Sequence, residues 1–419
     1  MTAVLVGFAF LVVRPEGGRA AGLEPAELSV AAFGAELELA NIKAHLDAFE
    51  KANPGISAEL TIIKYNQYPG WLAEHAESDS IPDIVYVDTS YLPSLQHGLL
   101  DIGGLIDEDQ TLVPDSFYPR LWESAHVDGV LKALPAFHVE QVIYYNRDMF
   151  EKAGVPPPRA NWTWDDFVRT AKQLTVRNAD GMEQYGYLCR ADQYAEVSTW
   201  VQQAGVRWGR NMYYDPHRIE ETLDALRFMA ELVHRHRISP DYKALRALLK
   251  EHRKHRYWFA NGPFAMVKTG TYELMNFRNG GLPFDWDMAE LPRHRRKANR
   301  LSVFALGIGR TTRYPVQAYA LAKFIIQRPA RGAPAMVDST VWDRYITFYG
   351  LENKNTAVFE KALAYGVQDE PAHRVLRENS RVRYGPLGLT HGKWSAESAE
   401  RYKKMLADYL EMKKEHTAK

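Results

Sequence analysis

The sequence predicts an α/β protein of two lobes, each a β-sheet flanked by helices, with several chain crossings between the lobes. Its 419 residues are enough for two domains of ordinary size. Strand and helix patterns alternate through the first hundred residues, which is typical of a sheet with helices on its faces. No Gly-, Ser- or Pro-rich linker divides the chain, so we expect the chain to pass between the lobes more than once.

The N-terminal part carries the alternation most clearly. Apolar residues at spacings of three and four predict a helix over residues 37–52, and Asn53-Pro54-Gly55 ends it, because proline cannot continue a helix. Strands are predicted over 27–33, 57–63 and 81–87, and further helices over 71–78 and 91–97. The order is therefore strand, helix, strand, helix, strand, helix.

Helical patterns dominate after an apolar run at residues 142–145. A strand at residues 263–267 interrupts them, and residues 301–308 read as another strand. Helices are predicted over 164–175, 191–204, 216–236, 241–256, 315–326 and 395–414.

The N-terminus suggests export. Residues 3–13 form an unbroken apolar run that is too short to span a bilayer but suits the core of a secretory signal. Small residues follow, and cleavage after Ala20 or Ala21 would remove residues 1–21. Met1-Thr2 lacks the usual basic charge, so a buried first strand or helix is the alternative. No cysteine lies near this end, so we expect an exported chain without a lipid anchor.

Composition excludes several classes of protein. The 52 basic and 52 acidic residues balance, whereas a protein that binds nucleic acid or an anionic membrane normally has a basic excess. The single cysteine, Cys189, excludes an internal disulfide framework and a cysteine-based zinc site. Aromatic residues make up 12%, and such rings can stack on the flat faces of sugars.

Motifs for metals, cofactors and nucleophilic catalysis do not occur. His234, His236, His252 and His255 are interleaved with Arg and Lys and contain no HExxH pattern, so they read as a solvated helix face. Neither a phosphate-binding GxxxxGK[ST] loop nor a GxSxG nucleophile turn is present. We therefore expect no metal and no cofactor.

Six blocks of sequence stand out along the chain, and most have a local structural role such as a turn or a helix cap. The blocks are FEKANPGI (49–56), IPDIV (81–85), GLLDI (98–102), IYYNRDMFEKAG (143–154), NWTWDDF (161–167) and FANGPFAM (259–266), followed by Gly270-Thr271-Tyr272. In sequence and in order, these blocks resemble the family 1 extracellular solute-binding proteins, the group that includes maltose-binding protein.

The resemblance implies a receptor that closes two lobes on a carbohydrate and delivers it to the permease subunits of an ABC transporter. It further implies a periplasmic monomer with no catalytic step and no nucleic-acid partner. Lobe 1 would comprise residues 26–137 and 303–335, and lobe 2 residues 142–300 and 340–419. The hinges would lie near 137–142, 300–304 and 335–342.

Candidate ligand-binding residues follow from strand ends and from the resemblance together, because open α/β sheets bind ligands beyond the carboxyl ends of their strands. For each candidate the alternative is an ordinary structural role, such as core packing or a helix cap. The candidates in lobe 1 and at the first crossing are Phe33, Tyr68, Asp88, His138 and Glu140. Those in lobe 2 and near the third crossing are Trp200, Trp208, Tyr272 and Trp342.

Two other functions stay open. The same fold could bind a polyamine, an anion or a sugar phosphate, and the basic segment 292–300 is the one feature that favours an acidic ligand, although an exposed loop is the simpler interpretation. A glycosidase would need two carboxylates that flank the scissile bond. Asp88 and Glu140 are the pair that the sequence offers, and nothing in the sequence fixes their separation.

Overall fold

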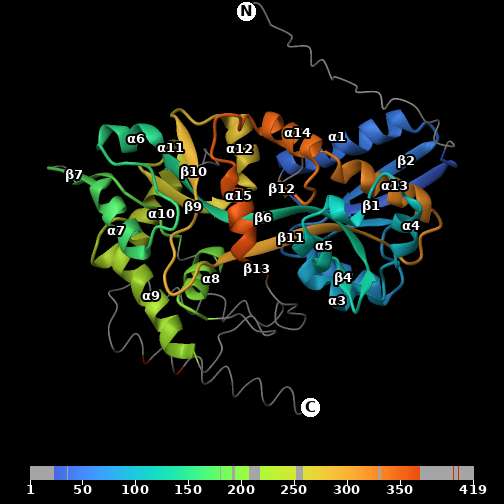
Figure 1. The fold of residues 1–419 in the computed structure, drawn as a ribbon, viewed down its shortest axis with the longest axis horizontal. Helices are drawn as coiled ribbons and strands as arrows, with labels where there is room; N and C mark the ends of the chain where they lie inside the picture. The colour runs from blue at the N-terminus through green and yellow to red at the C-terminus, as the bar shows by residue number, and fades with distance from the viewer. Residues whose placement is uncertain are drawn as a thin grey trace, which may run out of the picture.

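A computed structural model describes residues 23–34, 36–179, 181–190, 194–206, 218–251, 258–328 and 332–368, and the single residues 400 and 404. The described chain forms two lobes, and the long strands β6 (Ala133–Asn146) and β11 (Asn299–Ile308) run between them (Figure 1). The predicted signal segment 1–21, Trp208 and nearly all of the predicted tail helix lie outside the described residues.

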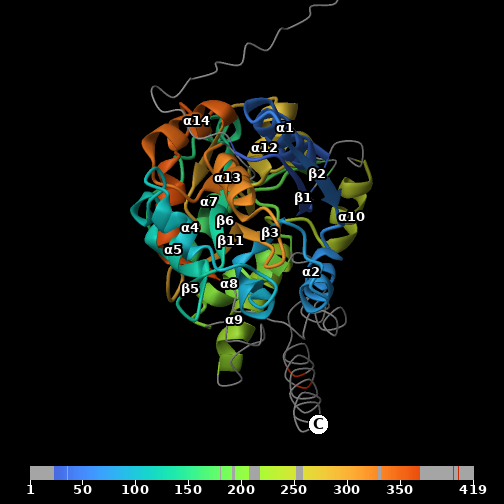
Figure 2. The same ribbon diagram turned by 90° about the vertical axis from the view of Figure 1, so that its right-hand side faces the viewer.

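Lobe 1 confirms the alternation expected from the sequence. Strand β1 (Ala26–Ala32) lies in the middle and pairs in parallel with β2 (Ile56–Ile62) and β3 (Ile84–Asp88). Helices α1 (Glu36–Ala52), α2 (Tyr68–Glu77) and α3 (Leu92–Leu95) follow these strands in turn. Helix α13 (Pro315–Ile326), whose bounds match the prediction, returns from lobe 2 and packs on α1, β1 and β6 (Figure 2).

The crossing strands join strands of both lobes into one nine-stranded sheet, whose main path has the order β10-β6-β11-β3-β1-β2; two further pairs of short strands form separate two-stranded sheets. Strand β6 pairs antiparallel with β11 over its first half and with β10 (Trp286–Ala289) over its end. Its other edge pairs with β12 (Ala333–Pro334) and β9 (Met266–Gly270), and β13 (Gly366–Gln368) pairs with β11. The sequence shows only an apolar run at residues 142–145 here, and no strand was predicted, because His138, Glu140 and Gln141 interrupt the apolar pattern.

Lobe 2 is mainly helical, as expected. The start of α7 (Trp164–Gln173) shows the local reason: Thr163 accepts a hydrogen bond from the Asp166 backbone, and Asp166 accepts one from Thr163 in return. The other large elements are α8 (Tyr194–Gln203), α9 (Ile219–His234), α10 (Tyr242–Glu251), α12 (Glu273–Gly280), α14 (Ser339–Tyr349) and α15 (Ala357–Tyr365).

Short elements complete the described fold. They are α4 (Gly103–Glu108), α5 (Pro119–Ser124), α6 (Arg147–Lys152), α11 (Trp258–Asn261), the single turns η1 (Thr89–Tyr91) and η2 (Pro114–Ser116), and the small strands β4 (His126–Val127), paired with β5 (Val130–Leu131), and β7 (Val176–Asn178), paired with β8 (Gly181–Gln184). Several predicted bounds differ from those of the structure by a few residues. For example, the strand expected at 263–267 is β9 (Met266–Gly270), because α11 extends to Asn261 and a bend follows it.

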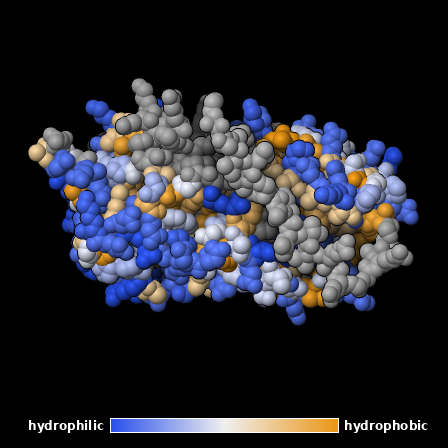
Figure 3. Space-filling view, turned by 90° about the horizontal axis from the view of Figure 1, so that it is seen from above, coloured by the Kyte–Doolittle hydropathy of each residue, from blue (hydrophilic) through white to orange (hydrophobic). Residues whose placement is uncertain are grey.

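Separate apolar cores support the two lobes. One buried cluster draws on residues 26–139 together with 301–341 and Leu363, whereas two others draw on residues 142–359. The exact lobe and hinge boundaries stay predictions. The face in Figure 3 is mostly hydrophilic, with apolar residues in small groups, and no helix in the described ranges is both long and apolar enough to cross a membrane.

Candidate functional site

An aromatic group lies where lobe 1 meets the crossing strands. Phe33 follows β1 and is buried, and its ring centroid is 4.9 Å from that of Tyr68 and 5.8 Å from that of Phe304 on β11. Phe304 stacks in turn on Phe137 of β6 at 4.9 Å. The structure thus brings the predicted residues Phe33 and Tyr68 together and adds two phenylalanines from the crossing strands.

Tyr68 has a structural role in this group. Its side chain is buried, and its hydroxyl donates a hydrogen bond to the Ala31 carbonyl at 2.9 Å. Burial raises its pKa well above the usual range, so the hydroxyl stays neutral and keeps this bond. Tyr68 therefore stabilises the end of β1 through its hydrogen bond to Ala31.

Tyr65, which the sequence argument did not select, is the exposed aromatic residue of this group. Its ring centroid lies 5.2 Å from that of Phe33, and 60% of the residue is exposed. The only available sequence signal for Tyr65 is its place in the polar loop after β2, the loop from which Tyr68 was the predicted candidate.

Asp88 ends β3 as predicted, and its carboxylate accepts a hydrogen bond from the Ser90 backbone at 3.0 Å. It therefore caps the turn η1, which is the structural role weighed for it above. In the sheet Asp88 lies opposite Phe304, so its side chain and the Phe33 group lie on the same face.

Tyr272 contributes an aromatic ring from lobe 2. It follows β9, its hydroxyl lies 3.2 Å from Thr269 Oγ1, and its ring packs against the lobe 1 core. A Cβ added to Gly270 would meet the Tyr272 ring at 2.4 Å and Val139 at 3.0 Å. The absence of a side chain at Gly270 therefore lets the ring lie against β6.

Strand alternation puts these rings on one face of the sheet. Phe137, Val139 and Gln141 alternate on β6, and Gln141 pairs directly with Gly270. The Phe33 group and Tyr272 thus approach the crossing from the two lobes. We define this set as the crossing face; it consists of Phe33, Tyr65, Asp88, Phe137, Val139, Gln141, Tyr272 and Phe304.

His138 and Glu140 lie on the opposite face of β6. His138 Nδ1 is 2.7 Å from Glu140 Oε1, and their side chains are 2% and 0% exposed. Buried hydroxyls of Thr271, Tyr345 and Tyr365 have no hydrogen-bond partner among the described residues. The pair is a buried polar group behind the crossing, and it does not line the face that carries Phe33 and Tyr272.

Trp342 lies on the side of Glu140. It belongs to α14, stacks on Tyr345 at 5.4 Å, and meets the edge of Phe359 at 6.3 Å. Burial raises the pKa of Tyr345 well above its usual range, and the nearby Glu140 adds to this effect. The Trp342 side chain is thus partly buried and packs against the aromatic rings of Tyr345 and Phe359.

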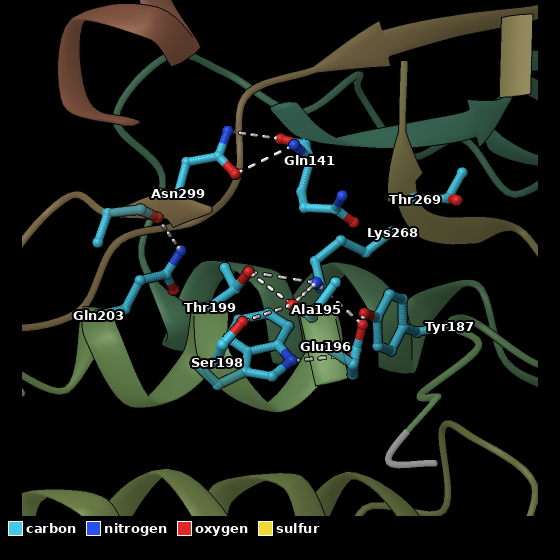
Figure 4. A network of polar contacts seen from close by, with 12 residues as sticks. Gln141, Tyr187, Ala195, Glu196, Ser198, Thr199, Gln203, Lys268, Thr269 and Asn299 are labelled. Atoms are coloured by element: carbon cyan, nitrogen blue, oxygen red, sulfur yellow. Dashed lines mark hydrogen bonds and ion pairs between the residues drawn. The ribbon is translucent and has the colours of Figure 1, made fainter. Parts of the chain in front are cut away.

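Trp200 lies in the core of lobe 2 and is 0% exposed. Its indole donates a hydrogen bond to Glu196 Oε1 at 2.8 Å, and Tyr187 donates to the same oxygen at 2.6 Å. Glu196 also pairs with Lys268, whose amine donates to the Ala195 carbonyl at 2.8 Å. The polar groups of this network therefore bond to one another inside lobe 2. The side chain of Gln141 points toward the network from β6 (Figure 4).

The basic segment 292–300 is held by neighbouring residues of lobe 2. Arg295 pairs with Asp224 at 2.6 Å, and Arg296 donates to the carbonyl oxygens of Gln202 and Val206 at 2.7 and 3.0 Å. Lys297 pairs with Glu290 at 3.0 Å. Arg295, Arg296 and Lys297 of this segment therefore form ion pairs or hydrogen bonds within lobe 2.

The carboxylates nominated for glycoside hydrolysis do not form a pair. Asp88 is opposite Phe304 and Glu140 is opposite Leu301 on β11, so strand spacings put their Cα atoms roughly 14 Å apart. Alternation also directs the two side chains to opposite faces of the sheet. In the described ranges no group of three His, Cys, Asp or Glu side chains could hold a metal ion.

Comparisons with known proteins agree with this architecture. An ABC substrate-binding protein from Listeria monocytogenes in complex with cycloalternan has a TM-score of 0.74 at 21% identity, over 92% of this chain and 99% of that one. The sugar-binding protein MalE from Xanthomonas citri has a TM-score of 0.68 at 18% identity, over 93% and 99%. Both likenesses concern the two-lobed fold.

Curated relatives match over shorter segments. An arabinooligosaccharide-binding protein from Halalkalibacterium halodurans is 25% identical over 161 residues, which is 38% of this chain and 34% of that protein. A putative binding protein from Brucella abortus is 28% identical over 142 residues, which is 33% of each chain. The aligned segments thus span about a third of these relatives.

A family model described as bacterial extracellular solute-binding protein matches residues 35–331. The match covers more than half of the chain and includes β2 and β3 of lobe 1, both long crossing strands and most of the lobe 2 helices. The chain therefore belongs to the bacterial extracellular solute-binding protein family.

Proposed function

We propose that the protein is the extracytoplasmic receptor of an ABC-type uptake system and that it binds a neutral mono- or oligosaccharide at the crossing face. The observation that carries the proposal is the meeting of aromatic rings from both lobes on that face. Tyr65 and Phe33 approach from lobe 1, and Tyr272 approaches from lobe 2. Rings on two sides can stack on the two faces of a sugar when the lobes close.

Polar groups beside these rings suit sugar hydroxyls. The Asp88 carboxylate can accept hydrogen bonds, and the amide of Gln141 can both donate and accept them. Phe137 and Phe304 would form the apolar floor. Tyr68 would act from behind, by holding the end of β1 through its bond to Ala31.

A neutral ligand fits the charges better than an anion or a polyamine. Lys268 is near Gln141, but Glu196 balances it. Arg295 is paired with Asp224, so the basic segment offers less free charge than its composition suggests. The names of relatives point the same way, since the Listeria protein binds cycloalternan and the Halalkalibacterium relative is called an arabinooligosaccharide-binding protein.

The remaining parts of the proposal follow from the family. The chain would be exported to the periplasm, act as a monomer, and deliver its ligand to permease subunits without any catalytic step. A closed, loaded form that docks on the permease is the expected switch for hinge-bending receptors. The separation of Asp88 from Glu140 supports the non-catalytic assignment.

A thermal-shift screen of the chain from residue 22 onward tests the ligand class. A compound that binds only the native state raises the melting temperature by mass action. The proposal predicts a rise with one class of neutral saccharide that is lost in Tyr272→Ala. A rise only with uronates, phosphates or amines would keep the fold and contradict the neutral-sugar assignment.

A further inference from the structure

A buried side-chain amide continues the strand ladder where the chain crosses between the lobes. Asn299 is the first residue of β11 and is 0% exposed. Its Oδ1 accepts a hydrogen bond from the Gln141 backbone N–H at 3.1 Å, and its Nδ2 donates to the Gln141 carbonyl at 2.8 Å (Figure 4). The side chain thus makes both hydrogen bonds that a neighbouring strand would make.

This contact lies where β6 changes its pairing partner from β11 to β10. Along one edge, β6 pairs with β11 as far as Glu140 and with β10 from Ile143 onward. Gln141 lies in the gap between these two partners. Without the Asn299 amide its buried backbone groups would lack partners on that edge, and such groups are costly to leave unpaired.

We propose that Asn299 is a positioning residue for lobe closure, which fixes the first two crossing strands to each other at the lobe 2 end. An amide suits this role because it carries a donor and an acceptor, whereas a carboxylate supplies only acceptors and an apolar side chain neither. Further bonds anchor the contact in lobe 2. Gln203 Nε2 donates to the Ala298 carbonyl at 3.0 Å, and Gln203 Oε1 accepts from the Trp164 indole at 2.7 Å.

The lobe 1 end of the same strand pair is irregular. The register between β6 and β11 shifts at Phe304 and Ala305, so Ala136 has no partner residue on β11. Such a bulge disrupts the ladder locally and lets a strand bend. In this proposal the part of each crossing strand on the lobe 2 side of the bulge moves with lobe 2, and rotation of lobe 1 is concentrated at Ala136, next to the Phe137–Phe304 stack of the crossing face.

Hydrogen exchange and interlobe distances on ligand-free protein test this proposal. Spin labels at Lys43→Cys and Arg169→Cys report the distance between the lobes, because both positions are exposed and the native Cys189 is buried. In the wild-type sequence the Gln141 amide should exchange more slowly than the Ala136 amide. Asn299→Leu removes the acceptor of the Gln141 N–H and should speed Gln141 exchange by about tenfold or more. Asn299→Asp keeps that acceptor but loses the donor to the Gln141 carbonyl, and both variants should broaden the distance distribution.

A matched control separates positioning from general weakening of lobe 2. Ser239 is buried, and its hydroxyl accepts a hydrogen bond from the Cys189 backbone at 2.9 Å. Ser239→Ala removes this bond and should leave both readouts at wild-type values.

Wild-type distances in a folded Asn299→Asp protein, or wild-type Gln141 exchange in a folded Asn299→Leu protein, would overturn the proposal. If Asn299→Leu does not fold, Asn299→Asp decides. Failure of both variants to fold would also overturn it, because Asn299 would then support the whole fold and not the crossing. Since no ligand is added, the result is independent of whether the protein binds a sugar.

Discussion

The amine of Lys268 lies 3.2 Å from Glu196 Oε2 inside lobe 2, where the two side chains are 1% and 2% exposed. Burial lowers the pKa of Lys268, and the adjacent Glu196 opposes this effect. Glu196 accepts further hydrogen bonds from Tyr187 and Trp200. The pair ties β9, which leads to Tyr272, to the beginning of α8.

Breaking this pair should cost much more than replacing it. Lys268→Met leaves Glu196 charged and buried, and we expect the free energy of unfolding to fall by about 3–5 kcal/mol. The double variant Lys268→Met/Glu196→Gln should recover part of the loss. Urea unfolding of the two single variants and the double variant checks this. Additive losses would contradict a coupled pair.

Trp200 should matter for folding more than for binding. Trp200→Ala removes the centre of an aromatic core, so the free energy of unfolding should fall by about 4 kcal/mol. Tyr272→Ala removes a partly exposed ring and should cost clearly less stability while it weakens ligand binding. Chemical denaturation and ligand titration of both variants check the contrast. Normal stability with lost binding in Trp200→Ala would instead make Trp200 a ligand residue.

Acid should weaken lobe 1 through His45. Burial, with a smaller contribution from Arg328, lowers the pKa of His45 to about 4. Between pH 6.5 and 4 the unfolded chain binds a proton that the folded chain does not, so stability falls as the pH falls through this window. The loss should approach about 3 kcal/mol near pH 4.

Unfolding of the wild-type protein and His45→Gln at pH 7 and pH 4.5 tests the assignment to His45. The stability lost on acidification should be smaller in the variant, because its side chain does not titrate. Equal losses in both proteins would mean that other groups cause the acid sensitivity.

Gly270→Ala should displace the Tyr272 ring. The new methyl group would lie within 3.0 Å of both the ring and Val139, so the ring has to move away from the crossing face. We expect about tenfold weaker ligand binding, equivalent to about 1.4 kcal/mol. Gly104→Ala is a suitable control, because no atom lies within 4 Å of a Cβ at that position. Equal affinities of the two variants would contradict the role given to Tyr272.

Much of the fold could be predicted from local sequence. The helix at 315–326 and the strands of lobe 1 have strong apolar periodicity and clear ends, and the structure confirms them. Strand β6 was not predicted, because a strand that crosses between two lobes is covered on both faces and carries buried polar residues such as Glu140. Periodicity cannot reveal a strand of this kind.

The candidate site was harder to predict, because a side chain's direction depends on packing. Tyr65 and Tyr68 are only three residues apart in the same polar segment. Tyr65 is exposed, whereas Tyr68 is buried and donates a hydrogen bond to Ala31. His138 and Glu140 lie on the crossing strand β6, but alternation along this strand directs their side chains away from Phe33 and Tyr272. Only the sheet register could supply that information.

Calorimetric titration of the purified protein with the saccharide that gives the largest thermal shift tests the central claim most directly. The account predicts binding of one saccharide per chain and at least about tenfold weaker binding in Tyr272→Ala. It also predicts an unchanged affinity in Gly104→Ala. Tight binding that is identical in Tyr272→Ala and the wild-type protein, or saccharide binding at no defined stoichiometry, would contradict a sugar site on the crossing face.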